Sequence, residues 1–137
     1  MKTFNIISWL LRLVVAITLL QTLYFKFTAH PESVHIFSSL GLEPYGRIGV
    51  GVAELITSIL ILIPSTKIYG MLGSLGIILG AIFSHVLVLG LDVGGDGGSL
   101  FALAILVLVC SSIFLFMHKI EILELLNKFK SPKEIKL

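Results

Sequence analysis

The sequence contains a single cysteine, Cys110, and that residue lies in a long apolar run. One cysteine cannot provide an intrachain disulfide, a CxxC redox pair or a cysteine-based metal site. The histidines are also scattered, and His30, His35 and His85 lack the paired spacing of metal ligands. We therefore expect no bound metal, and the thiol oxidoreductases are an improbable class for this chain.

Charge is also scarce. Of the 137 residues, 13% are charged and 56% are hydrophobic, and the mean hydropathy is +1.05, whereas about a quarter of the residues in a soluble domain are charged. The formal net charge of +2 says little about acidic partners, and we expect no nucleic acid among them. This composition indicates a one-domain integral membrane protein.

Four segments are long and apolar enough to cross a bilayer. A helix needs about 20 mostly apolar residues to span about 30 Å of hydrocarbon. Such runs lie at about residues 4–27, 45–63, 68–89 and 100–117. Their spacing predicts an all-α fold, an integral membrane antiparallel four-helix bundle formed by a transmembrane domain of residues 1–118.

Basic residues are distributed unevenly between the two ends of these spans. Lys26 and Arg47 fall near one side of the bilayer. The others fall near the opposite side: Lys2, Arg12, Lys67, Lys119, Lys128, Lys130, Lys133 and Lys136. Because segments rich in Lys and Arg stay in the cytoplasm, we expect both termini to be cytoplasmic.

A short amphipathic helix is predicted between the first and second spans. Residues 30–41 carry a proline suited to the first helical turn and a glycine suited to the end. Val34, Phe37 and Leu40 share a face of this helix, so we expect it to lie across the outer mouth of the bundle.

Residues 119–137 are predicted to be a cytoplasmic basic tail that begins as an amphipathic helix. Ile120, Leu123 and Leu126 are at helical spacing, and basic residues follow. Such a helix either lies on the inner membrane surface near anionic lipids or extends the fourth helix into solvent.

Four ionisable residues lie inside the predicted spans: Arg12, Lys26, Glu54 and His85. Such residues cost roughly 2.5 to 3.5 kcal/mol each on insertion scales, so each is a candidate for a functional site. With a rise of about 1.5 Å per residue, Glu54 falls near mid-membrane, and Lys26 and His85 fall toward the outer end. We predict a polar cluster of Lys26, Glu54 and His85 in the outer half of the bundle.

Helical faces suggest a partner for Glu54. It shares a face of the second span with Arg47 and Ser58, and Arg12 and Lys26 share a face of the first span. The depth of these residues in the membrane does not show whether Lys26 or Arg12 pairs with Glu54. We prefer Lys26 because the Arg12 side chain can snorkel to the cytoplasmic interface. The alternative is an ion pair that only fixes bundle assembly, with His85 as an ordinary helix-end histidine.

Three further features are expected to be structural. Gln21, on the opposite side of its helix from Arg12, is expected to make an interhelical hydrogen bond. In the loop at residues 90–100, Asp96 or Ser99 is expected to cap the fourth helix, with closure over the polar pocket as the alternative. The third span carries small residues on one side, which favours close helix packing over a ligand groove: Gly73, Gly76, Gly80 and Ser84.

Several short sequence motifs and single polar residues follow one another in a fixed order along the chain. They are Arg12 in the first span, YFKF with Lys26, SSLGLEP, GVAELITSILILIP with Glu54, a glycine-rich span ending in SHVLVLG with His85, and GGDGG before the fourth span. In this order, over about residues 8–118, they resemble the DoxX family and more closely its DoxX-like small four-span bacterial membrane proteins. The resemblance implies a four-helix bundle in the bacterial cytoplasmic (inner) membrane, linked in founding members to quinone-coupled sulfur oxidation and in others to oxidant-defence complexes.

From these observations we favour an accessory or ligand-binding subunit of a membrane complex, with an outward-facing polar pocket. The resemblance makes a quinone or lipid the expected ligand, with Lys26 bonding an oxygen and His85 and Glu54 passing protons. One alternative is a structural or assembly partner, in contact with other subunits or with copies of itself. Another is a small-solute transporter, which we favour less because we expect neither broken helices nor repeated halves. We expect no intrinsic cofactor and no enzyme activity of the chain on its own.

Overall fold

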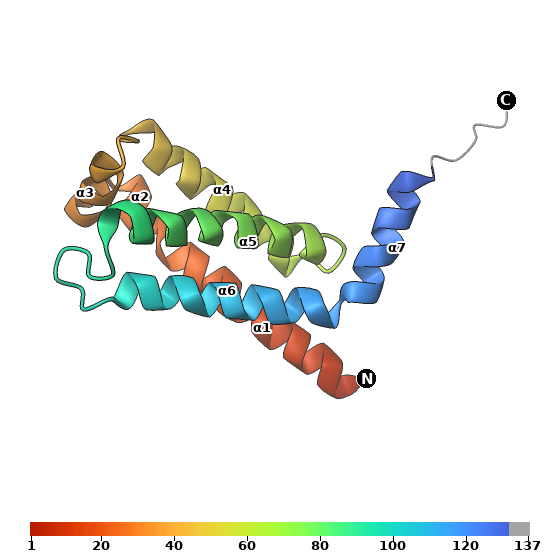
Figure 1. Ribbon diagram of the computed structural model, residues 1–137. Coiled ribbons are helices and arrows are strands. Elements are labelled where there is room, and N and C mark those ends of the chain that lie inside the picture. The colour runs from red at the N-terminus through yellow and green to blue at the C-terminus, as the bar shows by residue number, and fades with distance from the viewer. Residues whose placement is uncertain (132–137) are drawn as a thin grey trace, which may run out of the picture.

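The computed structural model describes residues 1–131, and all regular structure in that part of the chain is helical. Four long helices form a bundle in which each runs antiparallel to the next along the chain (Figure 1): α1 (Lys2–Gln21), α4 (Tyr45–Leu62), α5 (Lys67–Ser84) and α6 (Ser99–Met117). With their continuations they are long and apolar enough to cross a membrane, at Lys2–Phe27, Tyr45–Leu62, Lys67–Leu89 and Ser99–Met117. The predicted all-α four-helix membrane bundle is confirmed.

Two of the four spans are not continuous α-helices, contrary to the expectation of unbroken spans. The first is divided at Thr22 into α1 and a short helix, α2 (Leu23–Phe27). The backbone N–H of Thr22 bonds the carbonyl of Leu19 at 3.3 Å, and its hydroxyl bonds the same carbonyl at 2.8 Å. Bonds to the carbonyl three residues earlier interrupt the regular α-helical ladder and allow the helix to change direction.

The third span ends in one turn of π-helix, η1 (His85–Leu89). Its last hydrogen bond joins the Gly90 N–H to the His85 carbonyl at 2.7 Å. Gly90 then leaves the helix with φ of 77°, a conformation that glycine adopts without strain. Turns of π-helix are rare and often lie at functional sites.

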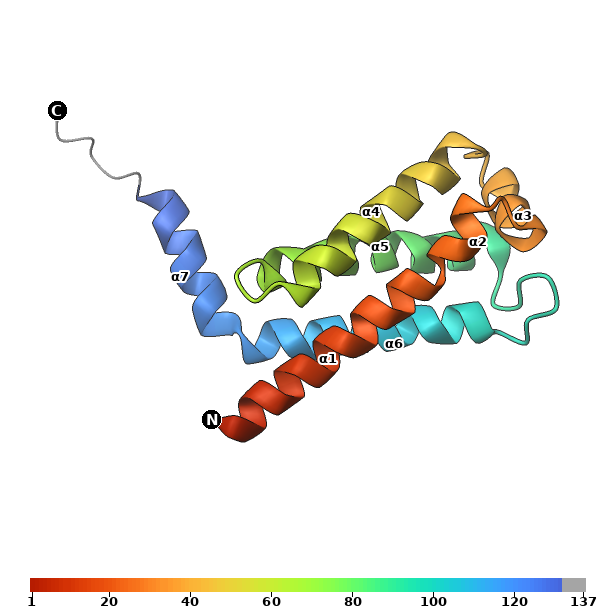
Figure 2. The same cartoon turned by 180° about the vertical axis from the view of Figure 1, so that it is seen from behind.

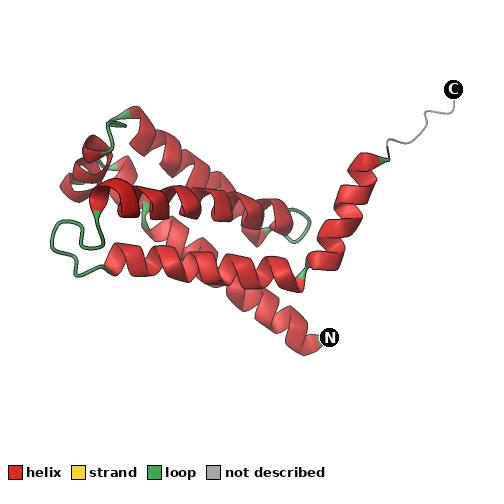
Figure 3. Ribbon diagram, viewed as in Figure 1, coloured by secondary structure: helices red, strands yellow, loops and turns green. Residues whose placement is uncertain are grey.

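The predicted amphipathic helix is present as α3 (Pro31–Ser39), at the same end of the molecule as α2 and the loop before α6 (Figure 2). The ring of His30 caps its first turn by accepting a hydrogen bond from the Glu32 N–H at 3.4 Å. Phe37 and Ser33 are buried against the bundle. We refer to this end as the outer end, following the predicted orientation. Loops are confined largely to the two ends of the bundle (Figure 3).

The inner half of the bundle is tightly packed. Val15, Met71 and Phe114, which come from α1, α5 and α6, are completely buried there. Close packing of α5 on α4 depends on Gly70, because a Cβ atom at this position would lie 2.5 Å from the backbone nitrogen of Ile61.

The predicted packing role of the glycine face is correct at one end and wrong at the other. A Cβ at Gly73 would lie 3.1 Å from the Thr57 hydroxyl, so this glycine does permit close contact. A Cβ at Gly76 or Gly80 would meet nothing within 4 Å. These two glycines, with Ser84, face an open cavity instead of a neighbouring helix.

The tail helix α7 (Lys119–Lys130) is not an extension of α6. The chain turns at His118, and α7 leaves the bundle at a steep angle (Figure 1). His118 is buried at this corner, where its Nδ1 lies 2.9 Å from the Phe114 carbonyl oxygen. Ile120, Leu123 and Leu126 remain exposed. The predicted basic end of the tail, residues 132–137 with Lys133 and Lys136, lies outside the described residues.

Candidate functional site

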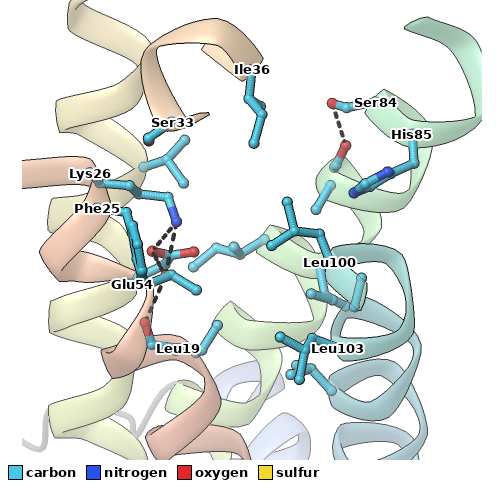
Figure 4. A pocket seen from close by; sticks show the side chains of 18 of the residues that line it. Leu19, Phe25, Lys26, Ser33, Ile36, Glu54, Ser84, His85, Leu100 and Leu103 are labelled. Carbon is cyan, nitrogen blue, oxygen red and sulfur yellow. Dashed lines mark hydrogen bonds and ion pairs between the residues drawn. The ribbon is translucent and has the colours of Figure 1, made fainter. Parts of the chain in front are cut away.

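A cavity of about 660 Å³ lies in the outer half of the bundle, bordered by helices α1 to α6 (Figure 4). Its walls are mostly aliphatic and aromatic side chains, among them Leu19, Phe25 and Leu103. Polar side chains are the minority and project from different elements: Thr18, Gln21, Thr22, Lys26, Glu32, Ser33, Glu54, Ser84, His85, Asp96 and Ser99. An apolar space with a few directed polar groups is the usual character of a small-molecule site.

One wall of the cavity carries an ion pair between Lys26 of α2 and Glu54 of α4. The Lys26 Nζ lies 3.0 Å from Glu54 Oε2, and both side chains are largely buried. The Thr22 hydroxyl lies between them, 2.9 Å from the same carboxylate oxygen and 2.9 Å from the Lys26 Nζ. Of the two partners considered for Glu54, Lys26 is the one in contact. Figure 4 shows the pair facing the open space.

The break in the first span positions this pair. Lys26 follows Thr22 by four residues, so the two side chains lie on one face across the break. Arg47 of α4 secures α2 from the other side: its guanidinium donates to the Lys26 carbonyl oxygen and pairs with the Glu43 carboxylate at 2.8 Å. Arg47 thus holds the backbone that carries Lys26 and does not itself line the cavity. Ser58 is also turned away, and its hydroxyl donates to the Glu54 carbonyl at 2.8 Å.

His85 lies on the opposite wall, at the start of η1. The residue is 6% exposed, and its ring packs edge-on against Phe101 and places Nδ1 2.9 Å from the Gly90 carbonyl oxygen. Figure 4 shows the ring across the cavity from Lys26 and Glu54. The three residues that the sequence groups together therefore line one space, in which Lys26 and Glu54 are paired and His85 contacts neither. No direct hydrogen bond joins His85 to Glu54 in the described part of the chain, so the expected proton exchange between them is not supported by a direct contact.

Asp96 lies at the outer end of the cavity and caps the first turn of α6. Its Oδ2 accepts the Leu100 N–H at 2.9 Å, and its Oδ1 accepts the N–H groups of Gly98 at 2.8 Å and Val93 at 3.0 Å. The backbone donor of Leu100, followed by that of Gly98, holds the pKa of Asp96 below its usual value. The expected capping contact is present, and because Asp96 also lines the cavity, the loop forms part of its outer wall.

Two other polar residues lie where the sequence did not place them. Arg12 does not snorkel: it is 2% exposed, and its Nε and Nη2 donate to the carbonyl oxygens of Ile61 at 2.7 Å and Leu62 at 2.8 Å. It therefore satisfies the C-terminal end of α4, far from Glu54 along that helix. Gln21 is exposed at the edge of the cavity, and within residues 1–131 it makes no interhelical hydrogen bond.

Sequence reasoning missed the importance of Thr22 and His118. Thr22 precedes Lys26 by four residues on the polar face of the first span, a spacing that would have indicated it. His118 follows the last apolar residue of the fourth span and so resembles a boundary residue, yet its Nε2 lies 3.3 Å from the hydroxyl of Ser8 in α1. Across the described part of the chain, no three His, Cys, Asp or Glu side chains are placed to hold a metal ion.

A family model described as the DoxX-like family matches residues 10–113 of the chain. The matched segment contains every polar residue that lines the cavity. No curated protein and no solved structure matches the chain.

Proposed function

The chain belongs to the DoxX-like family, and from this premise we propose that it is a ligand-binding accessory subunit in the bacterial inner membrane, whose outward-facing cavity holds a small amphiphile. The cavity volume of about 660 Å³ is within the range of roughly 300 to 1,000 Å³ typical of small-molecule sites. An amphiphile fits because most of the wall surface is apolar and polar side chains make up the smaller part of the lining.

One observation carries this proposal: the Lys26–Glu54 pair borders open space. A buried ion pair that served only to fasten helices would gain most from being enclosed by packed side chains. Here Gly76 and Gly80 of α5 line the same space, and a Cβ at either would meet nothing within 4 Å. The chain thus leaves room beside its most costly polar groups, which supports a ligand there.

A quinone is our preferred ligand, and a membrane lipid is the alternative. A quinone ring suits the apolar walls, and its oxygens suit the ammonium group of Lys26. The quinone assignment also draws on the family resemblance, since founding members of the DoxX family are linked to quinone-coupled sulfur oxidation. Activity on the ligand would then belong to a partner protein of the membrane complex, or to an assembly of several copies.

A structural role is the second candidate, and one observation favours it. The ion pair joins α2 to α4, so the same contact that faces the cavity also fastens the broken end of the first span. In this alternative the protein is an assembly partner with no small-molecule ligand. Transport has less support, because the inner half of the bundle is closed by completely buried side chains.

Native mass spectrometry of the protein in lipid nanodiscs, with added short-chain ubiquinone, tests the proposal. We expect a stoichiometric quinone adduct in the wild type and its loss in Gly76→Leu, which fills the cavity. Gly49→Leu is the matched control, because Gly49 lies on the exposed side of α4 with nothing within 4 Å of its Cβ position. Equal adduct in both variants, or none in the wild type, would contradict the quinone assignment.

Glu54→Gln separates the two candidate functions. If the variant keeps the thermal stability of the wild type and loses the adduct, the structural role is wrong. If it dissociates or unfolds in mild detergent, and neither quinone nor co-purified lipid is found on the wild type, the ligand site is wrong.

A further inference from the structure

We infer that the cavity selects a ligand carrying two hydroxyl or N–H donors, such as a dihydroxybenzene, over the corresponding dicarbonyl. This inference deepens the proposed function and rests on it. It comes from the hydrogen-bonding capacity that the protein leaves unused on the two facing walls of the cavity.

On the first wall, one oxygen of Glu54 has no protein partner. Both the Lys26 ammonium, at 3.0 Å, and the Thr22 hydroxyl, at 2.9 Å, contact Oε2, and no hydrogen bond within residues 1–131 reaches Oε1. No fully enclosed side-chain nitrogen or oxygen in this part of the chain lacks a partner, so Oε1 is accessible. Since Glu54 as a whole is 6% exposed, that access is from the cavity that it lines. Oε1 is therefore a hydrogen-bond acceptor that a donor on a ligand in the cavity can reach.

On the second wall, the orientation of His85 defines a second acceptor. A carbonyl oxygen only accepts hydrogen bonds, so the contact of Nδ1 with the Gly90 carbonyl at 2.9 Å requires the hydrogen to be on Nδ1. In the neutral ring Nε2 then carries a lone pair. Nε2 has no hydrogen-bond partner in the described chain, and the same argument from enclosure makes it accessible from the cavity.

The donor that lies beside Glu54 Oε1 is Lys26. Its ammonium group has three N–H bonds, and two of them are engaged by Glu54 and Thr22. A ligand hydroxyl beside the ion pair can accept from the third N–H and donate to Glu54 Oε1. A second hydroxyl at the other end of the ligand can donate to His85 Nε2.

A dicarbonyl ligand has only acceptors. It can use Lys26, but it leaves Glu54 Oε1 and His85 Nε2 unpaired after the ligand has displaced water from them. Each buried acceptor left unpaired weakens binding by about tenfold or more. We therefore expect the dihydroxy form to bind at least about 100-fold more tightly than the dicarbonyl form.

The test compares three forms of one alkylated benzene ring: 2,3,5-trimethylhydroquinone, its dimethyl ether and trimethylbenzoquinone. Dissociation constants would be measured on the full chain in nanodiscs under anaerobic conditions. We expect the hydroquinone to bind most tightly and the ether, which has the same ring and no donors, to bind as weakly as the quinone. His85→Leu should reduce the hydroquinone preference about tenfold, and the exposed-side variant Gly49→Leu should keep it.

The three ligands keep the inference falsifiable even if His85→Leu does not fold. A quinone or dimethyl ether that binds as tightly as the hydroquinone would overturn the selectivity while leaving a ligand-binding cavity in place. Absence of binding by all three forms would overturn the proposed function for quinone-type ligands, and the selectivity with it.

Discussion

Among single residues, the two buried arginines act on backbone carbonyls and not on the cavity. Arg12 donates hydrogen bonds to the last carbonyl oxygens of α4, and Arg47 donates one to a carbonyl oxygen in the last turn of α2. In a bilayer such carbonyls have no water to bond, so an internal cation is one of the few ways to satisfy them. A charged residue inside a span is therefore a candidate for backbone support as much as for chemistry, and the hydrogen-bond partner decides between the two.

We expect Arg12→Ala to destabilise the bundle by about 2 to 4 kcal/mol, because it removes two charge-assisted hydrogen bonds and leaves two buried carbonyls unpaired. The measurement is thermal unfolding in mild detergent. Lys67→Ala provides the comparison: Lys67 pairs with Glu121 at 3.5 Å near the surface, and such pairs contribute less than about 1 kcal/mol. Equal losses of stability in the two variants would contradict the assigned role of Arg12.

Asp96 is expected to give the outer loop an acid-dependent stability. Its folded-state pKa is depressed by backbone donors, chiefly that of Leu100, so its contribution is complete above the unfolded pKa of about 3.9 and is lost as the pH falls through the lower folded value. Hydrogen exchange at Val93, Gly98 and Leu100, corrected for intrinsic rates, should therefore be constant from pH 7 to 5 and accelerate only in stronger acid. Asp96→Asn should exchange faster at pH 7 and lack the acid transition.

At the scale of helices, the glycine-rich face of α5 has two different structural roles. Gly70 and Gly73 let α5 approach α4 in the inner half, whereas Gly76 and Gly80 leave the outer half open. Both roles use the same small residues at nearly the same spacing, so helical periodicity alone does not separate them.

Alanine substitutions should distinguish these roles. Gly70→Ala places a Cβ 2.5 Å from the Ile61 backbone nitrogen, so α5 must move away from α4 and the unfolding temperature should fall. Gly80→Ala meets no atom within 4 Å and should stabilise the helix by about 0.5 to 1 kcal/mol, because alanine loses less backbone entropy than glycine. Thermal unfolding of the two variants side by side is the measurement, and a loss of stability in Gly80→Ala would contradict an open cavity at that position.

We expect α7 to lie on the inner membrane surface, with its apolar side in the lipid. Phe129 and Asn127 are two residues apart and so lie on nearly opposite sides of the helix. In a Cys110→Ala background, a bimane label at Phe129→Cys should emit at shorter wavelength than one at Asn127→Cys in nanodiscs with phosphatidylglycerol. Identical emission from the two labels would mean that α7 projects into solvent.

At the scale of the whole molecule, an even number of antiparallel spans places the two ends of the bundle domain on one side of the membrane. The concentration of Lys and Arg at that side predicts that it is cytoplasmic. We expect alkaline phosphatase, which is active only after export, to be active when fused in the loop at residues 90–98. The same enzyme fused between Pro64 and Thr66 should be inactive, and a C-terminal green fluorescent protein should fluoresce. Reversed activities would invert the proposed orientation and place the cavity at the cytoplasmic side.

The sequence by itself determined the class of protein, the number and approximate limits of its spans, and the outer amphipathic helix. These follow because the bilayer imposes a length and an apolar composition on each span, and both can be read residue by residue. The depth of Glu54 and Lys26 followed from the same rise per residue, so both residues were placed in the outer half before any packing was known.

Only the tertiary structure decided how these residues are used. The break at Thr22 brings Lys26 onto Glu54, Arg12 reaches the end of α4 instead, and η1 places His85 on the opposite wall of the cavity. Helix rotation, local departures from α-helical geometry and the space left between helices depend on contacts between residues far apart in the chain, and no single helical pattern contains them. The cavity is the clearest case, because it exists only where helices α1 to α6 leave space between them.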